Sequence, residues 1–219
     1  MPVHKIATKV GIVPVYGKTF DYIIMDEVTN MTDLFISECS FLKTKIRDVV
    51  ASRMAEIPGP VALLFKSCCS LSGGAISSIY HSEQANDFDL WANSEDYIKV
   101  ISDSLAKQDL SFIRVGDTGK EYSGSQMSEE FRRTGKFVTD NAVTLKNRLQ
   151  FIKLGTIEQC RPTFDFAHCM PHYNMNLDKL FISKVQWEAI RSKKLVPMRE
   201  REKISSSRKV KLEMKGWVW

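Results

Sequence analysis

The stretch from Val61 to Gln108 constrains the fold more than any other part of the sequence. It opens with the apolar run VALLFKSCC, which is rich enough in large side chains to be a buried strand. A glycine turn follows directly, and AISSIY behind it has the first turns of a helix. NDFDLW then alternates polar and apolar residues as a strand does, and SEDYIKVISDSLAKQ shows helical spacing. This order predicts an α/β (α+β) core, in which helices pack on a mixed β-sheet.

Composition limits the class of protein. The chain has 219 residues, 43% of them apolar and 26% charged, which is typical of a soluble globular protein with a substantial core. No apolar run approaches the roughly 20 residues that a bilayer span requires, and the first residues lack the apolar region of a signal peptide. Five cysteines are an odd number, which favours reduced thiols over a disulfide framework. We therefore expect a cytoplasmic protein, in the host cytoplasm if it is viral, with no membrane partner.

The segments on either side of the core are expected to be mainly helical. Residues 31–57 carry apolar side chains at helical spacing, with Thr29 or Asn30 as a possible cap, and short strands or extended chain precede them. The chain from Asn176 onward also looks helical. The expected division is a mainly helical amino-terminal segment 1–60, a core 61–175 and a basic helical extension 176–219.

The second half of the core predicts a loop and then three strands. Residues 116–136 are polar and rich in glycine, which is typical of a loop, with a short helix at Ser128–Arg133. FVTDNAVTL and RLQFIKL are separated by a turn at Lys146-Asn147 and predict a hairpin. PTFDFAH alternates in the same way and predicts a third strand around Asp165.

Charge is distributed unevenly along the chain. From Lys179 to Trp219 there are 12 Lys and Arg residues against 4 acids, whereas the rest of the chain carries a small excess of acids. A basic tail on a nearly neutral body indicates a polyanionic partner such as nucleic acid. A solvated helical face is the other interpretation of the same pattern.

Three aspartates are candidate metal ligands. Asp87 and Asp89 are two residues apart, so on a strand both carboxylates project from the same face. Two carboxylates so placed can chelate Mg²⁺, and a third on a neighbouring strand would complete a site for two metal ions. Asp165 qualifies, because the phenylalanines on either side of it would hold its strand in the core. The sequence therefore predicts these three residues as a catalytic, metal-binding set.

The glycine turn followed by D-x-D and a later carboxylate resembles the DNA polymerase β-like nucleotidyltransferase superfamily. GGAISSIYHSEQANDFDLW is similar to the corresponding block of tRNA CCA-adding enzymes and bacterial poly(A) polymerases. NAVTLKNRLQFI and FDFAHCMPHYN resemble nucleotidyltransferase-like proteins of bacteriophages. The resemblance spans residues 68–173, and it implies a nucleotidyltransferase-type mixed sheet.

The resemblance also implies a reaction, a cofactor and a nucleotide site. A nucleoside monophosphate would pass from an NTP to a hydroxyl acceptor with release of pyrophosphate, and the expected acceptor is an RNA 3′ end such as that of tRNA. Two Mg²⁺ or Mn²⁺ ions would be held by the three aspartates, and Asp165 would help to deprotonate the acceptor. The residues expected to contact the nucleotide are the glycine-turn group and three later cations: Ser72, Gly73, Gly74, Arg132, Arg133 and Lys136.

Two other functions are compatible with the same residues. A toxin-like or antibiotic-modifying nucleotidyltransferase would use the same metal site on a protein or small-molecule acceptor. A non-catalytic RNA-binding protein on a degenerate nucleotidyltransferase fold would instead need neither metal nor NTP, and its binding would fall steeply with salt.

Overall fold

The computed structural model describes residues 13–15, 18–20, 23–24, 33–111 and 133–219 of the chain. The candidate caps Thr29 and Asn30, and most of the loop predicted at 116–136 with its short helix, lie outside these residues. The first half of the described chain contains β1 (Val13–Val15), β2 (Lys18–Phe20), β3 (Ile23–Ile24), α1 (Asp33–Ala55), α2 (Gly59–Cys68), β4 (Cys69–Ser72), α3 (Gly74–Tyr80), β5 (Phe88–Ala92) and α4 (Glu95–Lys107). The second half contains β6 (Lys136–Val138), β7 (Ala142–Leu145), β8 (Leu149–Thr156), α6 (Ile157–Cys160), β9 (His172–Asn174), β10 (Lys179–Ile182), α7 (Lys184–Arg191) and α8 (Ser206–Glu213), with 3₁₀ turns η1 (Arg161–Thr163), η2 (Ala167–Cys169) and η3 (Arg201–Lys203).

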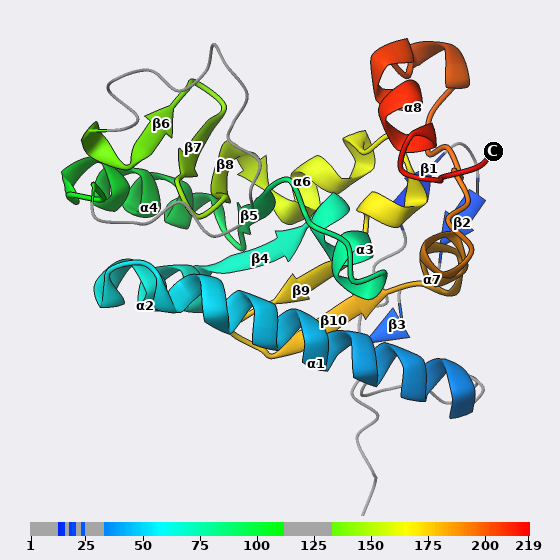
Figure 1. Cartoon of the computed structure of the whole chain (residues 1–219), viewed down its shortest axis with the longest axis horizontal. Helices are drawn as coiled ribbons and strands as arrows, with labels where there is room; N and C mark the ends of the chain where they lie inside the picture. The colour runs from blue at the N-terminus through cyan, green and yellow to red at the C-terminus, as the bar shows by residue number, and fades with distance from the viewer. Residues whose placement is uncertain (1–12, 16–17, 21–22, 25–32, 112–132) are drawn as a thin grey trace, which may run out of the picture.

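A mixed sheet forms the centre of the molecule. Its eight described strands have the order β3-β10-β9-β4-β5-β8-β7-β6. The pair β5 and β8 is parallel and the other neighbouring pairs are antiparallel. Figure 1 shows α1 and α2 running along one side of the sheet, α4 beside β6 to β8, and α7 and α8 at the opposite end. The expected fold class, a mixed sheet with packed helices and helical segments on both sides in sequence, is confirmed.

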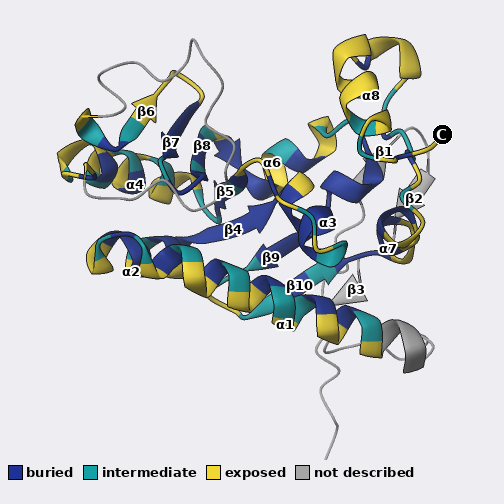
Figure 2. Ribbon diagram, viewed as in Figure 1, coloured by how far each residue is buried: buried dark blue, intermediate teal, exposed yellow. Residues whose placement is uncertain are grey.

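The long amino-terminal helix owes its place to one apolar stripe. In α1 the side chains of Cys39, Leu42, Ile46, Val50 and Met54 are at most 5% exposed, and they recur every three or four residues along the helix. They join the main core under the sheet. Figure 2 shows the outer side of α1 exposed and the central strands buried. The predicted helix at 31–57 is therefore confirmed over its described length.

The apolar run after it is a helix, not the predicted strand. Pro60 stands in the first turn of α2, where its missing N–H costs nothing. Val61, Phe65 and Cys68 are buried while Leu63 between them is 67% exposed, which is a helical stripe. A short apolar run fits a buried strand and a buried helix equally well, and here only its last residue, Cys69, begins the strand.

Two later predictions were also wrong. The segment around Asp165 forms no strand of the sheet, because two 3₁₀ turns interrupt it and Phe166 makes only an isolated bridge to Pro197. The chain after Asn176 is not entirely helical, since β10 pairs with β9 and extends the sheet. The predicted hairpin is confirmed, because β7 and β8 pair antiparallel across the turn at residues 146–148.

Strand pairing brings the glycine turn to the acidic pair. Ser72 at the end of β4 lies opposite Asp89 on β5, and opposite His172 on β9. The backbone N–H of Gly73 donates to the carbonyl of Cys169 at 3.1 Å, which ties the turn to η2. Within the described ranges, no helix is long and apolar enough to cross a membrane.

Candidate functional site

Gly73 and Asp89 fit together without space for a side chain on the glycine. Gly73 has φ of +90°, a conformation that side chains disfavour, and a Cβ placed on it would lie 2.8 Å from Asp89 Oδ2. Gly74, the first residue of α3, has no such neighbour within 4 Å. The glycine turn therefore lets the Asp89 carboxylate approach the backbone where β4 passes into α3.

The two carboxylates of the D-x-D motif have different surroundings. Asp87 precedes β5 and is exposed, whereas Asp89 lies within β5 and is partly buried. Burial, and then the negative charge of Asp87, raise the pKa of Asp89 to about 7, although Arg208 acts in the opposite direction. A cation bound beside the two carboxylates would lower the pKa of Asp89 and so favour the ionised form of both groups.

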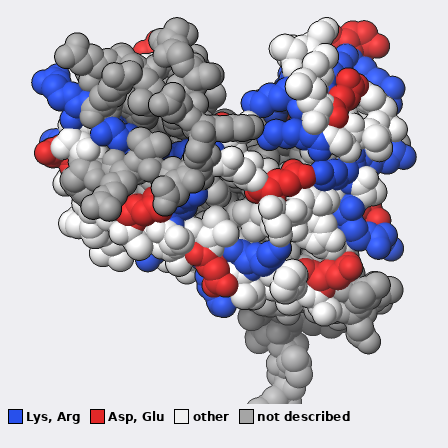
Figure 3. All heavy atoms as spheres, in the orientation of Figure 1, with Lys and Arg blue, Asp and Glu red and all other residues white. Residues whose placement is uncertain are grey.

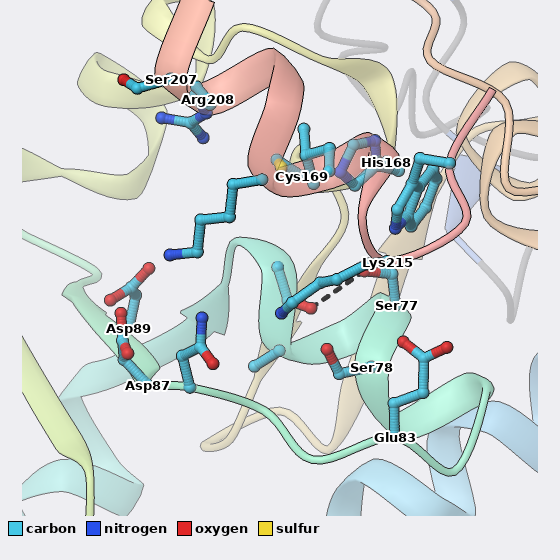
Figure 4. A pocket seen from close by; sticks show the side chains of 16 residues that line it. Ser77, Ser78, Glu83, Asp87, Asp89, His168, Cys169, Ser207, Arg208 and Lys215 are labelled. Carbon is cyan, nitrogen blue, oxygen red and sulfur yellow. Dashed lines mark hydrogen bonds between the residues drawn. The ribbon is translucent and has the colours of Figure 1, made fainter. Parts of the chain in front are cut away.

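A pocket of about 460 Å³ opens in front of these carboxylates. Its described lining comes from α3, from the residues leading into β5, from η2, and from α8 with the turn after it. Figure 4 shows Asp87 and Asp89 on one side of the pocket and Arg208 on α8 on the other. A volume of this size is ordinary for a small-molecule site.

The side of the pocket opposite the acids is cationic. Arg208, Lys211 and Lys215 line it. Figure 3 shows Lys and Arg side chains gathered on the part of the molecule that carries α8, beside a hollow in the surface. The basic tail was visible in the sequence, but these three residues were not predicted to belong to the site. Arg208 and Lys211, three residues apart on α8, lie on one side of the helix, and Lys215 follows in the turn after it; this spacing was the available signal.

Asp165 has partners other than the predicted ones. Its Oδ1 lies 3.0 Å from Arg199 Nε and its Oδ2 lies 3.2 Å from Arg208 Nε. Its side chain is 14% exposed, so both ion pairs are largely shielded from water. The structure thus gives Asp165 two guanidinium partners, and its service as a third metal ligand stays a prediction.

The other predicted nucleotide contacts are dispersed. Ser72 is fully buried, and its hydroxyl donates to the carbonyl of Pro171 at 2.8 Å. Lys136 donates to the carbonyls of Ala106 and Gln108 at 2.9 and 3.1 Å and so closes the end of α4. Neither residue lines the pocket described above.

The two arginines of the predicted loop add little to the site. Arg133 is exposed at the start of the described segment 133–219, and Arg132 lies outside the described residues. Among the predicted nucleotide contacts that the structure describes, the turn at residues 72–74 is brought to Asp89, whereas Arg133 and Lys136 do not line the pocket.

The donor set suits a hard divalent cation held jointly with a substrate. Over the described ranges, no group of three or more His, Cys, Asp and Glu residues could hold a metal by itself. Mg²⁺ is commonly bound by one or two carboxylates, with phosphate oxygens and water completing its coordination. Asp87 and Asp89, adjacent and poorly neutralised, fit that arrangement.

Comparison with known families identifies the chain. The model of the Gabija anti-defense 2 family matches residues 19–193, which is most of the sequence. The chain belongs to this family. The match includes Asp87, Asp89 and Asp165, whereas α8 and its cations lie beyond it.

Solved structures of CCA-adding enzymes resemble the chain weakly. One from Thermotoga maritima, complexed with tRNA, is 12% identical with a TM-score of 0.38, and the match covers 68% of this chain and 36% of that one. Another, in complex with CTP, is 14% identical with a TM-score of 0.37 and coverages of 68% and 35%. The chain thus spans about a third of the length of these structures. Among curated proteins, no sequence matches it.

Proposed function

We propose that this chain is a metal-dependent nucleotidyltransferase whose activity counteracts the Gabija defense. The observation that carries the proposal is the pair Asp87 and Asp89 at the edge of a pocket whose opposite side is cationic. Nucleotidyl transfer requires acidic side chains that hold a divalent cation and basic side chains that hold the phosphates. The family's name supports the second half of the proposal.

The proposed reaction is an in-line displacement at the α-phosphorus of an NTP. The acceptor hydroxyl oxygen forms a bond to this phosphorus, while the bond to the oxygen that bridges to the β-phosphate breaks. Pyrophosphate leaves with the electron pair of that bond, and the hydroxyl proton passes to water. A bound Mg²⁺ or Mn²⁺ would supply charge neutralisation on the phosphates and a lower pKa of the attacking hydroxyl.

Asp87 and Asp89 would hold this cation. Asp89 is anchored in β5 beside the glycine turn, so its carboxylate has a defined position. Asp87 is exposed and can adjust to the cation and its phosphate ligands. A second ion would need a further ligand, and Asp165 could provide one only by exchanging an arginine partner.

An RNA 3′ end is the acceptor that the sequence resemblance favours. A protein or small-molecule acceptor, as in toxin-like nucleotidyltransferases, would use the same pocket. The basic character of the tail supports a polyanionic acceptor. The assay below therefore offers RNA, protein and small-molecule fractions side by side.

The test is transfer of label from each α-³²P-labelled NTP, in Mg²⁺ or Mn²⁺, to these acceptor fractions. We expect label on one acceptor with the wild type, at least a hundredfold less with Asp87→Asn/Asp89→Asn, and none in EDTA. Asp103→Asn is the matched control, because Asp103 is an exposed aspartate of α4 whose carboxylate pairs with Lys99 at 2.6 Å. This control should transfer label as the wild type does.

Label that does not depend on Asp87 and Asp89 would contradict the assignment of the site. Absence of transfer with every NTP and acceptor, together with salt-sensitive RNA binding, would replace the enzyme by an RNA-binding protein.

A further inference from the structure

The helix α8 lies beyond the family match and yet forms one side of the pocket. It is held there by a small apolar cluster of its own, in which Leu212 packs with Ile204 and Trp217. Trp217 is 4% exposed, and its ring stacks on that of His168 at a centroid distance of 3.8 Å. The tail is therefore a fixed wall of the pocket rather than a solvated arm.

The cations of α8 are sorted by the face on which they lie. Arg208, Lys211 and Lys215 follow each other at intervals of three and four residues and line the pocket. Lys209 is on another face, where its ammonium lies 5.8 Å from the ring centre of Trp219. Three of the four cations between Arg208 and Lys215 thus line the same pocket as the acidic pair.

Arg208 is positioned by a partly buried acid. Asp165 pairs with its Nε at 3.2 Å, and the same carboxylate is held from the other side by Arg199 at 3.0 Å. The Arg208 side chain is still 48% exposed, so part of the guanidinium remains accessible from the pocket. In the described part of the chain, no carboxylate pairs with Lys211.

The geometry points to α8 and the turn after it as the triphosphate-binding wall of the site, with Arg208, Lys211 and Lys215 contacting the phosphates and Asp165 positioning Arg208. This inference rests on the proposed function and specifies which residues recognise its substrate. The pocket has three cations on one side and two acids on the other. Its ligand must therefore present negative charge to the cations and a bound cation to the acids. A metal-bound triphosphate has that charge pattern, because its cation can face the acids while its phosphates face Arg208, Lys211 and Lys215.

Binding measurements separate this role from the reaction itself. The probes are inorganic tripolyphosphate and an NTP analogue with a methylene group between the α- and β-phosphates, titrated calorimetrically into the full chain with Mg²⁺. We expect Lys211→Ala to weaken both by about tenfold, as the loss of one charged hydrogen bond does. Lys209→Ala, a matched removal of charge from the same helix, should change either by less than about twofold, and Lys211→Arg should restore binding.

Asp165→Asn tests the positioning role. We expect it to weaken tripolyphosphate binding about as much as Arg208→Ala does, while Mn²⁺ binding in the absence of phosphate stays as in the wild type. Loss of Mn²⁺ binding with unchanged tripolyphosphate affinity would overturn this role and make Asp165 a metal ligand.

Three further outcomes separate the inference from the proposed function: the first two contradict the inference alone, and the third contradicts the proposed function alone. If Lys211→Ala transfers nucleotide with an unchanged KM for the NTP, α8 does not bind the triphosphate, although the chain is still a transferase. If Lys211→Ala and Lys209→Ala weaken single-stranded RNA binding equally and leave tripolyphosphate unaffected, α8 is an RNA-binding surface. If tripolyphosphate binds as expected but no nucleotide is ever transferred, the phosphate-binding role of α8 is supported and the proposed reaction is contradicted.

Discussion

At the scale of single residues, Gly73 sets both the path of the backbone between β4 and α3 and the position of the Asp89 carboxylate. Its positive φ turns β4 into α3, and the space its absent side chain leaves is taken by the Asp89 carboxylate. The glycine turn and the D-x-D motif could both be recognised from the sequence, because each has a local pattern. Their direct contact could not, because it depends on the register that places Ser72 opposite Asp89.

Substitution of the two glycines should therefore have unequal effects. Gly73→Ala is expected to lower the free energy of unfolding by about 1 to 3 kcal/mol, because φ of +90° with ψ of −162° is a backbone conformation that essentially only glycine adopts, and to displace Asp89. Gly74→Ala should fold at least as well as the wild type, because Gly74 begins a helix with open space around it. Urea denaturation and the transfer assay, run on both variants, check this. Equal transfer rates of the two variants would mean that the contact between Gly73 and Asp89 is unimportant.

His172 gives the fold a dependence on pH. Burial, and then the positive charge of Arg161, lower the pKa of His172 from its ordinary value near 6.5 to about 3. Between these values the unfolded chain binds a proton that the folded chain does not, so stability is lost as the pH falls below 6.5. At pH 5 the loss from this residue is about 2 kcal/mol.

The variant His172→Phe isolates that contribution. A phenyl ring keeps the parallel stack on Phe181, whose centroid lies 4.6 Å away, and takes up no proton. We expect the variant to lose about 2 kcal/mol less than the wild type between pH 7 and pH 5, measured by urea denaturation. Identical losses in the two proteins would show that His172 is protonated in the folded state.

At the scale of elements, the structure departs from the sequence analysis where local patterns are ambiguous. VALLFKSCC is helical as far as Cys68, and its buried residues fall at helical spacing, which a run of only nine residues does not reveal. The segment around Asp165 alternates like a strand, yet the Asp165 carboxylate forms ion pairs with two arginines from distant parts of the chain. Periodicity cannot detect such partners, because they are brought together only by tertiary packing.

The attachment of α8 is the element whose loss would most affect the site. Trp217→Ala removes the stack on His168 and a nearly fully buried indole, and we expect it to cost about 3 to 5 kcal/mol of stability. Trp219→Ala is the matched control, since that side chain is 36% exposed, and it should cost much less. Limited proteolysis should release the tail in the first variant only. A tail that is equally protected in both would contradict the anchoring role of Trp217.

At the scale of the whole molecule, the uneven charge of the chain has a structural outcome. The body supplies the acids, the tail supplies the cations, and the fold places the two across one pocket. The excess of charge in the tail was visible in the sequence. The side of the molecule that this charge faces was not visible, because nothing in the local sequence indicates that α8 lies across the pocket from α3 instead of extending into solvent.

The most direct test of the account is relief of the Gabija defense in cells. A bacterial strain that carries Gabija is challenged with a phage that this defense restricts, while it expresses the wild type, Asp87→Asn/Asp89→Asn or the control Asp103→Asn at equal levels. We predict that the wild type and the control restore phage plating and that the double variant, although folded, does not. Full relief by the double variant would show that the chain acts by binding alone, and it would contradict the claim that the acidic pair carries the function.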